Sequence, residues 1–243
     1  MQFYTTPQFT IFFGDQATGF APQEFYTIGS EAELRNAPQF KDAAEEMQLK
    51  YLMALKQVHG VAGKVFVKPE DFACRPYDFE GDYLITSVLH AGLAVATADC
   101  LPMVIYDTKN HVVAAAHAGW RGSVAGIGEK VLEEMQRHFG TQPEDCTVVF
   151  GPAAGSCCYE VAQEFLENIP QAYRNRVVKE RAGLLFFDNT LYNQLQLEQL
   201  GVPAQAFVKD YALCTICSPQ FCSYRRDKER SQRQMTIVAL NSI

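Results

Sequence analysis

Short apolar runs alternate with polar segments along the whole chain, and they determine which elements the sequence predicts. The runs are rich in Val, Ile and Phe, and their length and composition are typical of β-strands. We therefore predict strands over residues 8–13, 51–58, 64–67, 83–88, 92–97, 103–107, 111–117, 146–150, 204–209 and 234–240.

Helical periodicity is clearest over residues 123–139. Apolar side chains recur there at three- and four-residue spacing from Val124 to Phe139, as on the buried face of an amphipathic helix. Gly140 follows and is typical of a helix end. The pattern predicts one helix across this segment.

Two further helices are predicted among the later strands. One spans about 188–200, with Asp188 placed to cap it and Gly201 placed to end it. The other spans 160–168. Helices that alternate irregularly with many short strands favour an α+β fold, in which mixed sheets are flanked by helices in layers, over a doubly wound parallel fold.

The chain of 243 residues has no internal repeat and no linker, so we expect a single domain over 1–243. Hydrophobic residues make up 48% and charged residues 20%, as in ordinary globular proteins. A chain of this size buries a sufficient core without a disulfide or a structural metal. A metal site would therefore be free to perform chemistry.

The net charge of −7 argues against a nucleic-acid partner. No apolar stretch reaches the roughly 18 residues that a membrane span needs. The first residues lack a basic segment ahead of an apolar run, so we expect a cytoplasmic protein with eight reduced cysteines. Residues 224–233 carry five basic and two acidic side chains, which indicates either a solvated charge run or a small anion site.

Four segments place reactive side chains beside glycine or proline at the ends of predicted strands. Functional groups are expected at such positions, on loops held by a rigid scaffold. The segments are 57–60 (QVHG), 97–102 (TADCLP), 117–122 (HAGWRG) and 151–160 (GPAAGSCCYE).

His59, Cys100 and His117 lie in three of these segments. Taken singly, a histidine or cysteine after an apolar strand is typical of a packed residue. Taken together, two imidazoles and one thiolate suit zinc, and three protein ligands leave the open position of a catalytic site. Linear spacing alone leaves both interpretations open. Copper can replace zinc on such ligands.

Asp99, directly before Cys100, is the fourth candidate catalytic residue. Bound zinc lowers the pKa of water to about 7, which supplies hydroxide at neutral pH. The Asp99 carboxylate could orient a ligand or carry a proton in such a site. The alternative is a turn-forming aspartate before Pro102.

The remaining cysteines form a rival metal motif. Cys214 and Cys217 are spaced as C-x-x-C and Cys222 follows, but a fourth ligand is missing downstream. We therefore predict packing thiols and no second metal. Cys157 and Cys158 are either nucleophiles behind a glycine-rich turn or packing residues, and because adjacent side chains usually point in opposite directions, packing is favoured for at least one of them.

These motifs resemble the YfiH-like family of laccase-domain proteins, also named polyphenol oxidases and regarded as purine nucleoside phosphorylases. The resemblance covers about residues 55–240 in the family's order, and its ADCLP and HAGWRG pieces are highly specific. The matching pieces are Gln57–Gly60, Asp82 in GDYLIT, Thr97–Pro102, His117–Gly122, Gly151-Pro152, Cys158–Val161 and Ser223–Asp227.

The resemblance implies zinc on His59, Cys100 and His117. It also implies phosphorolysis of adenosine, inosine and methylthioadenosine, with deamination of adenosine as a further activity. Nucleosides and phosphate would then be the partners of a monomer or homodimer. The implied fold is a layered α+β arrangement similar to that of a bacterial deamidase toxin.

Five residues in the matching motifs are candidates for substrate binding. Arg121 follows the second histidine by four residues and lies near the start of the predicted helix, where a helix N-terminus adds attraction for an anion. Arg225 and Arg226 form a possible fork for phosphate, although in an extended segment only one of them would face the cleft. Gln57 and Tyr224 complete the set.

The N-terminal fifth departs from the family pattern. The family has Ser-Thr-Arg followed by Gly-Gly, whereas residues 14–19 here read GDQATG and lack the arginine. The next family motif appears as EFYTIG over 24–29. If the missing arginine holds phosphate or ribose, substrate preference or phosphorolysis differs in this chain.

Two other kinds of activity use the same residues. An amide hydrolase acting on a small peptide or a peptidoglycan precursor would use zinc, or Cys100 as a nucleophile activated by His117. A copper-dependent phenol oxidase is the other, but oxygen-reducing copper clusters are held mostly by imidazoles and the chain has only five histidines. A metal-binding module without turnover is disfavoured by the open three-ligand set.

Overall fold

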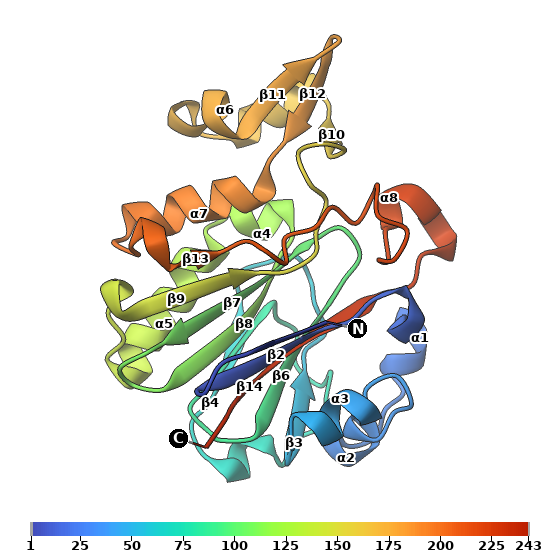
Figure 1. Cartoon of the computed structure of the whole chain (residues 1–243), viewed down its shortest axis with the longest axis vertical. Coiled ribbons are helices and arrows are strands. Elements are labelled where there is room, and N and C mark those ends of the chain that lie inside the picture. Colours follow the sequence, from blue (N-terminus) through green and yellow to red (C-terminus); the bar gives the residue numbers. More distant parts are fainter. Residues whose placement is uncertain (1, 243) are drawn as a thin grey trace.

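Two β-sheets stacked face to face form the centre of the molecule (Figure 1). The structure is a computed structural model that describes residues 2–242. In the five-stranded sheet the last strand pairs between an N-terminal strand and a middle strand, so both ends of the chain enter one sheet. Its order is β1 (Gln2–Thr5), β2 (Phe9–Phe13), β14 (Gln234–Leu240), β6 (Ala91–Thr97) and β3 (Tyr51–Ala54).

The six-stranded sheet carries most of the motifs that the sequence singles out. Its central pair β7 and β8 is antiparallel, whereas the outer pairs β13–β9 and β5–β4 are parallel. Its order is β13 (Phe207–Val208), β9 (Cys146–Phe150), β7 (Leu101–Asp107), β8 (Val112–Ala118), β5 (Tyr83–Thr86) and β4 (Gly63–Phe66).

Alternating side chains assign each face of these strands to a different core. On β8, Val113 and Ala115 point into the core between the two sheets, while Val112 and Ala114 point into the core on the outer face. Successive side chains of a strand face opposite sides, and here both sides are apolar. The strand is therefore buried on both faces, which explains its nearly continuous apolar sequence.

Helices cover the outer face of each sheet (Figure 1). The layers therefore run helix, sheet, sheet, helix, which confirms the predicted α+β fold of mixed sheets flanked by helices. Over the five-stranded sheet lie α1 (Pro22–Phe25), α2 (Glu31–Arg35) and α3 (Lys41–Glu46). Over the six-stranded sheet lie α4 (Trp120–Val124), α5 (Ile127–Phe139) and α7 (Asn189–Gln199).

A small third unit stands at one end of the molecule, at the top of Figure 1. It has its own core of buried side chains, among them Val177, Phe187 and Tyr192. It contains the three-stranded sheet of β10 (Glu160–Val161), β12 (Leu184–Phe187) and β11 (Val178–Arg181), with α6 (Gln171–Val177) beside it. The last helix of the chain is α8 (Tyr224–Asp227), and short 3-10 turns span Gln16–Thr18, Pro69–Phe72, Pro143–Asp145, Gln163–Asn168, Ala204–Ala206 and Lys228–Arg230.

Several predicted elements differ from the structure. The predicted helix over 123–139 is two helices, because Gly126 adopts a left-handed conformation with φ of 83° and divides α4 from α5. The predicted helix over 160–168 is wrong: its start pairs as strand β10 and the rest forms a 3-10 turn. The strand over 51–58 ends at Ala54, and that over 204–209 is reduced to Phe207–Val208.

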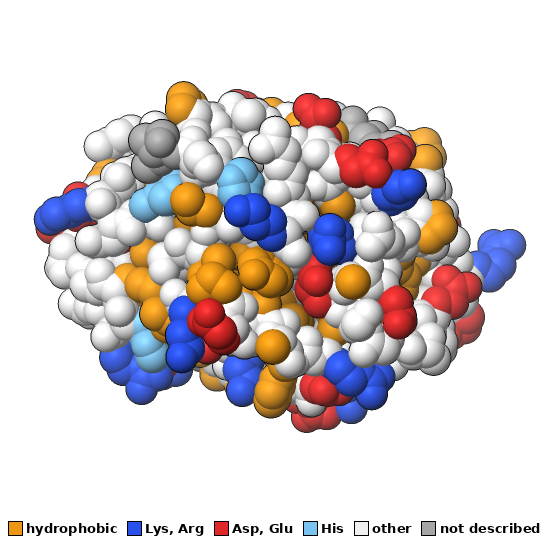
Figure 2. All heavy atoms as spheres, turned by 90° about the horizontal axis from the view of Figure 1, so that it is seen from below, with side chains coloured by type: hydrophobic (Ala, Val, Ile, Leu, Met, Phe, Trp, Pro, Cys, Tyr) orange, Lys and Arg blue, Asp and Glu red, His pale blue; other side chains and the backbone are white. Residues whose placement is uncertain are grey.

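The surface shown in Figure 2 mixes basic and acidic side chains around a central group of hydrophobic ones. On this face the basic side chains are interspersed with acidic ones and do not form a continuous basic stripe. Within residues 2–242, the longest apolar helices fall short of what a membrane crossing requires.

Candidate active site

Three strand ends bring His59, Cys100 and His117 together. His59 follows β3 in a left-handed conformation with φ of 61°, Cys100 immediately precedes β7, and His117 lies near the end of β8. Their ligand atoms all lie within 4.8 Å of one another, and the two imidazole rings meet edge to face with centroids 4.8 Å apart. The structure therefore assembles the three residues that the sequence grouped as metal ligands.

Asp82 orients the ring of His117 and holds the backbone at His59. Its buried carboxylate accepts a hydrogen bond from Nδ1 of His117 at 2.8 Å and from the backbone nitrogens of His59 at 2.9 Å and Gly60 at 2.6 Å. Because Nδ1 of His117 is engaged, Nε2 is the nitrogen left for a metal. The sequence analysis quoted Asp82 in the GDYLIT motif but did not assign it a role in the site.

Nearby charges favour the thiolate form of Cys100, which is the form that can bind a metal. Burial raises the pKa of Cys100, but the adjacent His117 and hydrogen bonds from both histidines outweigh burial and lower that pKa to about 6. Burial lowers the pKa of His117, but Cys100 and Asp82 outweigh it and raise that pKa above its usual range. A thiolate therefore prevails at neutral pH, which is the form that binds metal.

The donor atoms fit a zinc ion. Two imidazole nitrogens and one thiolate match its borderline-soft preference, and a set of three leaves one position for water or substrate. Gly119 gives this set its room, because a Cβ atom there would lie 2.8 Å from Cδ2 of His59 and 3.2 Å from Sγ of Cys100. A residue with a side chain at this position would displace the ligands.

The three ligands line a cavity of about 490 Å³, a size that suits a small-molecule ligand. Its remaining walls are strongly aromatic and come from segments far apart in the sequence. Tyr77 and Thr97 are among the lining residues, and their hydroxyl oxygens are covered by neighbouring atoms and have no hydrogen-bond partner among residues 2–242. The aromatic lining residues are Phe20, Phe25, Tyr26, Tyr77, Trp120, Tyr159 and Tyr224.

Three arginines line the same cavity: Arg121, Arg225 and Arg233. The Arg121 guanidinium stacks 4.4 Å above the Trp120 ring, and that of Arg225 lies 5.0 Å from the Tyr159 ring centroid. Within the described part of the chain, none of these arginines forms an ion pair with a carboxylate. Arg225 and Arg233 each use one guanidinium nitrogen to bond backbone oxygens, of Glu160 at 2.9 Å and of Gln232 at 3.0 Å. Their charge is not neutralised by a carboxylate, and the remaining donors are available to an anionic ligand.

Arg226 lies outside the cavity, unlike its neighbour Arg225. Its guanidinium donates hydrogen bonds to the backbone oxygens of Thr215 and Phe221, both at 2.7 Å, and pairs with Asp227 at 2.8 Å. The sequence expected only one member of the Arg pair to face the cleft, and the structure identifies that member as Arg225. The donors of Arg226 are used by the fold, which argues against the predicted contact between Arg226 and substrate.

Gln57 and Asp99 line the cavity, but their polar atoms are engaged by the fold. The Gln57 amide both donates to and accepts from the backbone of Ala96, at 2.8 and 2.7 Å. The Asp99 carboxylate accepts hydrogen bonds from the Thr215 hydroxyl at 2.7 Å and the Arg225 backbone nitrogen at 2.6 Å. Both residues position the cleft wall, and this geometry favours the structural interpretation of Asp99 over a proton carrier.

The helix beside Arg121 differs from the expectation. Arg121 lies in α4, which has only five residues because Gly126 ends the helix early. A helix this short contributes little of the dipole that the sequence analysis invoked for anion binding. The attraction for an anion therefore depends on the guanidinium groups themselves.

Sequence reasoning missed the wall that the N-terminal region supplies. Phe20, Phe25 and Tyr26 come from the part of the chain that departs from the family pattern, and Tyr77 from a loop without a motif. Nothing in their local sequence points to a cleft. Arg233 lies in the basic segment over 224–233, and this cluster of charge is the sequence feature that could have identified it as a cavity residue.

Comparison with known proteins identifies the family. A family model described as multi-copper polyphenol oxidoreductase laccase matches residues 30–241. The purine nucleoside phosphorylase of Aquifex aeolicus is 38% identical over 161 residues, which cover 66% of this chain and 72% of that protein. That of Deinococcus radiodurans is 34% identical over 188 residues, covering 76% and 69%. A protein named adenosine deaminase RL5, from an unknown prokaryotic organism, is 36% identical over 160 residues, covering 64% and 60%.

Solved structures share the fold over nearly the whole chain. The hypothetical protein YfiH of Bacillus licheniformis matches with a TM-score of 0.80 and 27% identity, covering 98% of this chain and 99% of that one. YlmD from Geobacillus stearothermophilus matches with a TM-score of 0.78 and 25% identity, covering 96% and 92%. The chain belongs to the multi-copper polyphenol oxidoreductase laccase family, in which its curated relatives include purine nucleoside phosphorylases.

Proposed function

We propose that this protein is a zinc-dependent purine nucleoside phosphorylase, acting on adenosine, inosine and methylthioadenosine. The observation that carries the proposal is that one cavity combines a His₂Cys ligand set, an aromatic wall and three arginines that form no ion pair within residues 2–242. The names of the curated relatives agree with it.

His59, Cys100 and His117 would hold the zinc ion. When bound, zinc would act as a Lewis acid and make a coordinated water acidic near neutral pH. Asp82 contributes by orienting the ring of His117 and holding the backbone at His59, and Gly119 by leaving room for the ligands.

The aromatic wall suits a purine. A planar, weakly polar base gains dispersion and stacking contacts from rings such as those of Tyr26, Tyr77 and Tyr159. Burial raises the pKa of Tyr77 far above its usual range, so its hydroxyl stays protonated and can donate a hydrogen bond. Together with the Thr97 hydroxyl, it would give a nucleoside two polar contacts once the ligand displaces the side chains that cover both groups.

The arginines suit phosphate. In phosphorolysis a phosphate oxygen forms a bond to the anomeric carbon of the ribose while the bond from that carbon to the purine nitrogen breaks. Arg121, Arg225 and Arg233 would hold the dianion and align it with the departing base. Most of the acceleration would then come from positioning and charge stabilisation.

Deamination of adenosine is part of the same proposal. Water would replace the amino group of the base, and phosphate would not be required. The similarity to the protein named adenosine deaminase RL5 supports testing it. The experiment is to incubate zinc-loaded protein with each nucleoside, with and without phosphate. Chromatography then separates ribose 1-phosphate and free base, the products of phosphorolysis, from inosine, the product of deamination.

A covalent mechanism is the second candidate, because Cys100 and His117 lie close enough to form a thiolate–imidazolium pair in metal-free protein. An amide hydrolase could use that pair directly. A covalent adduct on Cys100, trapped during turnover and detected by mass spectrometry, would identify it. Inactivation by a chelator, with recovery on addition of zinc, supports the metal mechanism instead.

Copper-dependent phenol oxidation finds less support in the site. Only two of the five histidines reach the cavity. The others are engaged elsewhere: His90 contacts Ser242, His111 contacts Tyr106 and His138 contacts Glu134. A cluster of several copper ions held by imidazoles therefore lacks its ligands among the described residues.

A further inference from the structure

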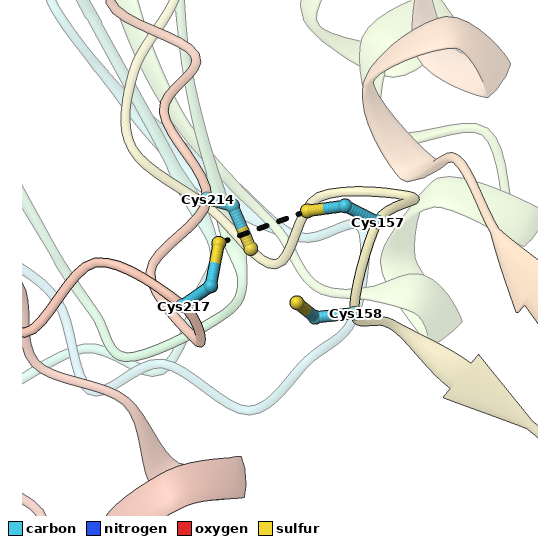
Figure 3. Close-up of side chains that lie close together, drawn as sticks. All are labelled: Cys157, Cys158, Cys214 and Cys217. Atoms are coloured by element: carbon cyan, nitrogen blue, oxygen red, sulfur yellow. Dashed lines mark hydrogen bonds between the residues drawn. The ribbon is translucent and has the colours of Figure 1, made fainter.

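Four cysteines from two loops lie together outside the active-site cavity (Figure 3). Cys157 and Cys158 lie in the turn between β9 and β10, and Cys214 and Cys217 in the loop between β13 and α8. Their sulfur atoms all lie within 4.8 Å of one another, and Sγ of Cys157 is 3.8 Å from Sγ of Cys217. The two further ligands of the C-x-x-C pair therefore come from upstream in the chain, whereas the sequence offers none downstream.

Local turns explain how neighbouring cysteines face the same point. The backbone nitrogens of Cys158 and Tyr159 both donate to the oxygen of Gly155 at 2.9 Å, which makes this segment a helical turn. Successive side chains in such a turn are about 100° apart and not opposite, as they would be in a strand. The expectation that Cys157 and Cys158 point in opposite directions is therefore wrong at this turn.

Packing does not explain this cluster. Cys157 and Cys217 are exposed, whereas cysteines that serve as small hydrophobic residues are buried. Cys222, which the sequence grouped with the C-x-x-C pair, is fully buried and lies outside the cluster, so only this third cysteine behaves as the packing thiol that was predicted.

One pair of sulfur atoms already has the spacing of a tetrahedral metal site, and the others lie within 1 Å of it or closer together. Thiolates bound to zinc at about 2.3 Å in a tetrahedron lie about 3.8 Å from one another. The distance between Cys157 and Cys217 equals that edge without any rearrangement. A disulfide, in contrast, would need the two sulfur atoms at about 2.05 Å.

The backbone around the cluster holds one of its sulfur atoms in place. The amide nitrogen of Gly155 donates a hydrogen bond to Sγ of Cys214 at 3.4 Å. A Cβ atom on Gly155 would approach the Cys214 Cβ to 3.0 Å, so the glycine is required for this close contact.

We propose that Cys157, Cys158, Cys214 and Cys217 bind one zinc ion in a closed structural site, in addition to the catalytic site. Four protein ligands leave no open position for water or substrate, which distinguishes a structural from a catalytic zinc. This site is independent of the proposed nucleoside chemistry, since it shares no ligand with His59, Cys100 and His117.

The location of the cluster indicates what the metal would stabilise. The turn that holds Cys157 leads directly to Tyr159, and the loop that holds Cys217 leads to Arg225; both of these residues line the active-site cavity. Backbone hydrogen bonds already join the loops, from Thr215 to Ala153 at 2.9 Å. A zinc ion here would fasten together two segments of the cleft wall.

Zinc content of the full chain, purified under reducing conditions and loaded with zinc alone, tests the proposal. The His59→Ala variant removes a catalytic ligand, so the zinc that remains reports the four-cysteine site. We expect one zinc per chain in His59→Ala and none in His59→Ala/Cys217→Ser. Cys217→His should restore binding in the same background, because imidazole is also a zinc ligand. Cys74→Ser, which removes a half-buried cysteine outside both sites, is the matched control and should retain the ion.

A second readout separates loss of metal from loss of fold. Because Cys217 is exposed, serine there should leave the circular dichroism spectrum unchanged. Added zinc should raise the unfolding temperature of His59→Ala but not that of His59→Ala/Cys217→Ser, since only the former binds the ion in its native state. No zinc in His59→Ala, equal zinc in both variants, iron in place of zinc, or a disulfide between Cys157 and Cys217 in the reduced preparation would each overturn the proposal.

Discussion

The carboxylate of Asp82 accepts a hydrogen bond from Nδ1 of His117 at 2.8 Å, deep in the protein. The same oxygen accepts a hydrogen bond from the backbone nitrogen of His59 at 2.9 Å. One buried carboxylate from the start of β5 therefore sets the position of two candidate ligands that arrive on different strands.

The Asp82→Asn variant should bind the catalytic zinc about 10–100-fold more weakly, the usual cost of losing a partner behind a metal ligand. The amide presents one acceptor oxygen where the carboxylate serves several donors at once. A competition titration against a zinc-binding dye measures the change. Asp107→Asn is the control, because Asp107 is equally buried in the same sheet but accepts hydrogen bonds from Asn110, away from the site. Equal zinc affinity in both variants would contradict this role.

Gly119→Ala should lose most of its zinc and its turnover. The new Cβ would lie 2.8 Å from His59 and 3.2 Å from Cys100, distances that require the ligands to move. Gly60→Ala is a matched control in the same site, because its Cβ would meet its nearest neighbours at 3.6 and 3.7 Å, which is ordinary contact. The comparison needs only metal analysis of the purified variants, and full zinc occupancy in Gly119→Ala would argue against the assigned geometry.

Arg121→Ala and Arg225→Ala should each weaken the use of phosphate. Losing one charge-assisted contact costs about 1.5–3 kcal/mol, or roughly 10–100-fold in kcat/KM for phosphate. Arg226→Ala should leave that value unchanged and instead lower the unfolding temperature, because this side chain binds backbone oxygens of the neighbouring loop. A kcat/KM for phosphate that falls only in Arg226→Ala would show that Arg226, and not Arg121 or Arg225, binds phosphate.

Tyr77→Phe and Thr97→Val should raise the KM for nucleoside. Each removes a buried hydroxyl without a partner in the described chain, from a residue that lines the cavity, so the proposed contact with the nucleoside is lost while the fold keeps its hydrogen bonds. A lost neutral hydrogen bond is worth about 0.5–1.5 kcal/mol, or roughly 2–13-fold in KM. Tyr106→Phe, at a buried tyrosine outside the cavity, should leave the KM unchanged. A KM equal to the wild-type value in Tyr77→Phe and Thr97→Val, as in Tyr106→Phe, would show that these hydroxyls do not contact the nucleoside.

The layers of the fold and the three candidate ligands could be predicted from the sequence, and the reason is physical. Strands buried on both faces, such as β7 and β8, leave long apolar runs that local patterning detects. His59, Cys100 and His117 stand at the ends of such runs, where loops on a rigid sheet carry reactive groups. Their common motif context then supported a single site.

The residues of the cleft wall could not be predicted from the sequence, because the wall depends on contacts between distant segments. Tyr26 and Tyr77 meet edge to face across the N-terminal half, and neither lies in a motif. The four-cysteine cluster joins residues about sixty positions apart, and the search for its ligands followed chain order. The break at Gly126 was missed for a different reason, since the apolar periodicity continues across a left-handed residue.

Formation of ribose 1-phosphate tests the central claim most directly. Zinc-loaded protein is incubated with inosine and phosphate, and both ribose 1-phosphate and hypoxanthine are quantified beside the His117→Ala variant. We expect equal amounts of the two products from the wild-type protein, and none from His117→Ala. Product formation should depend on phosphate, stop when a chelator is added and resume on addition of zinc. Hypoxanthine released without phosphate, or equal product from wild type and His117→Ala, would contradict the claim.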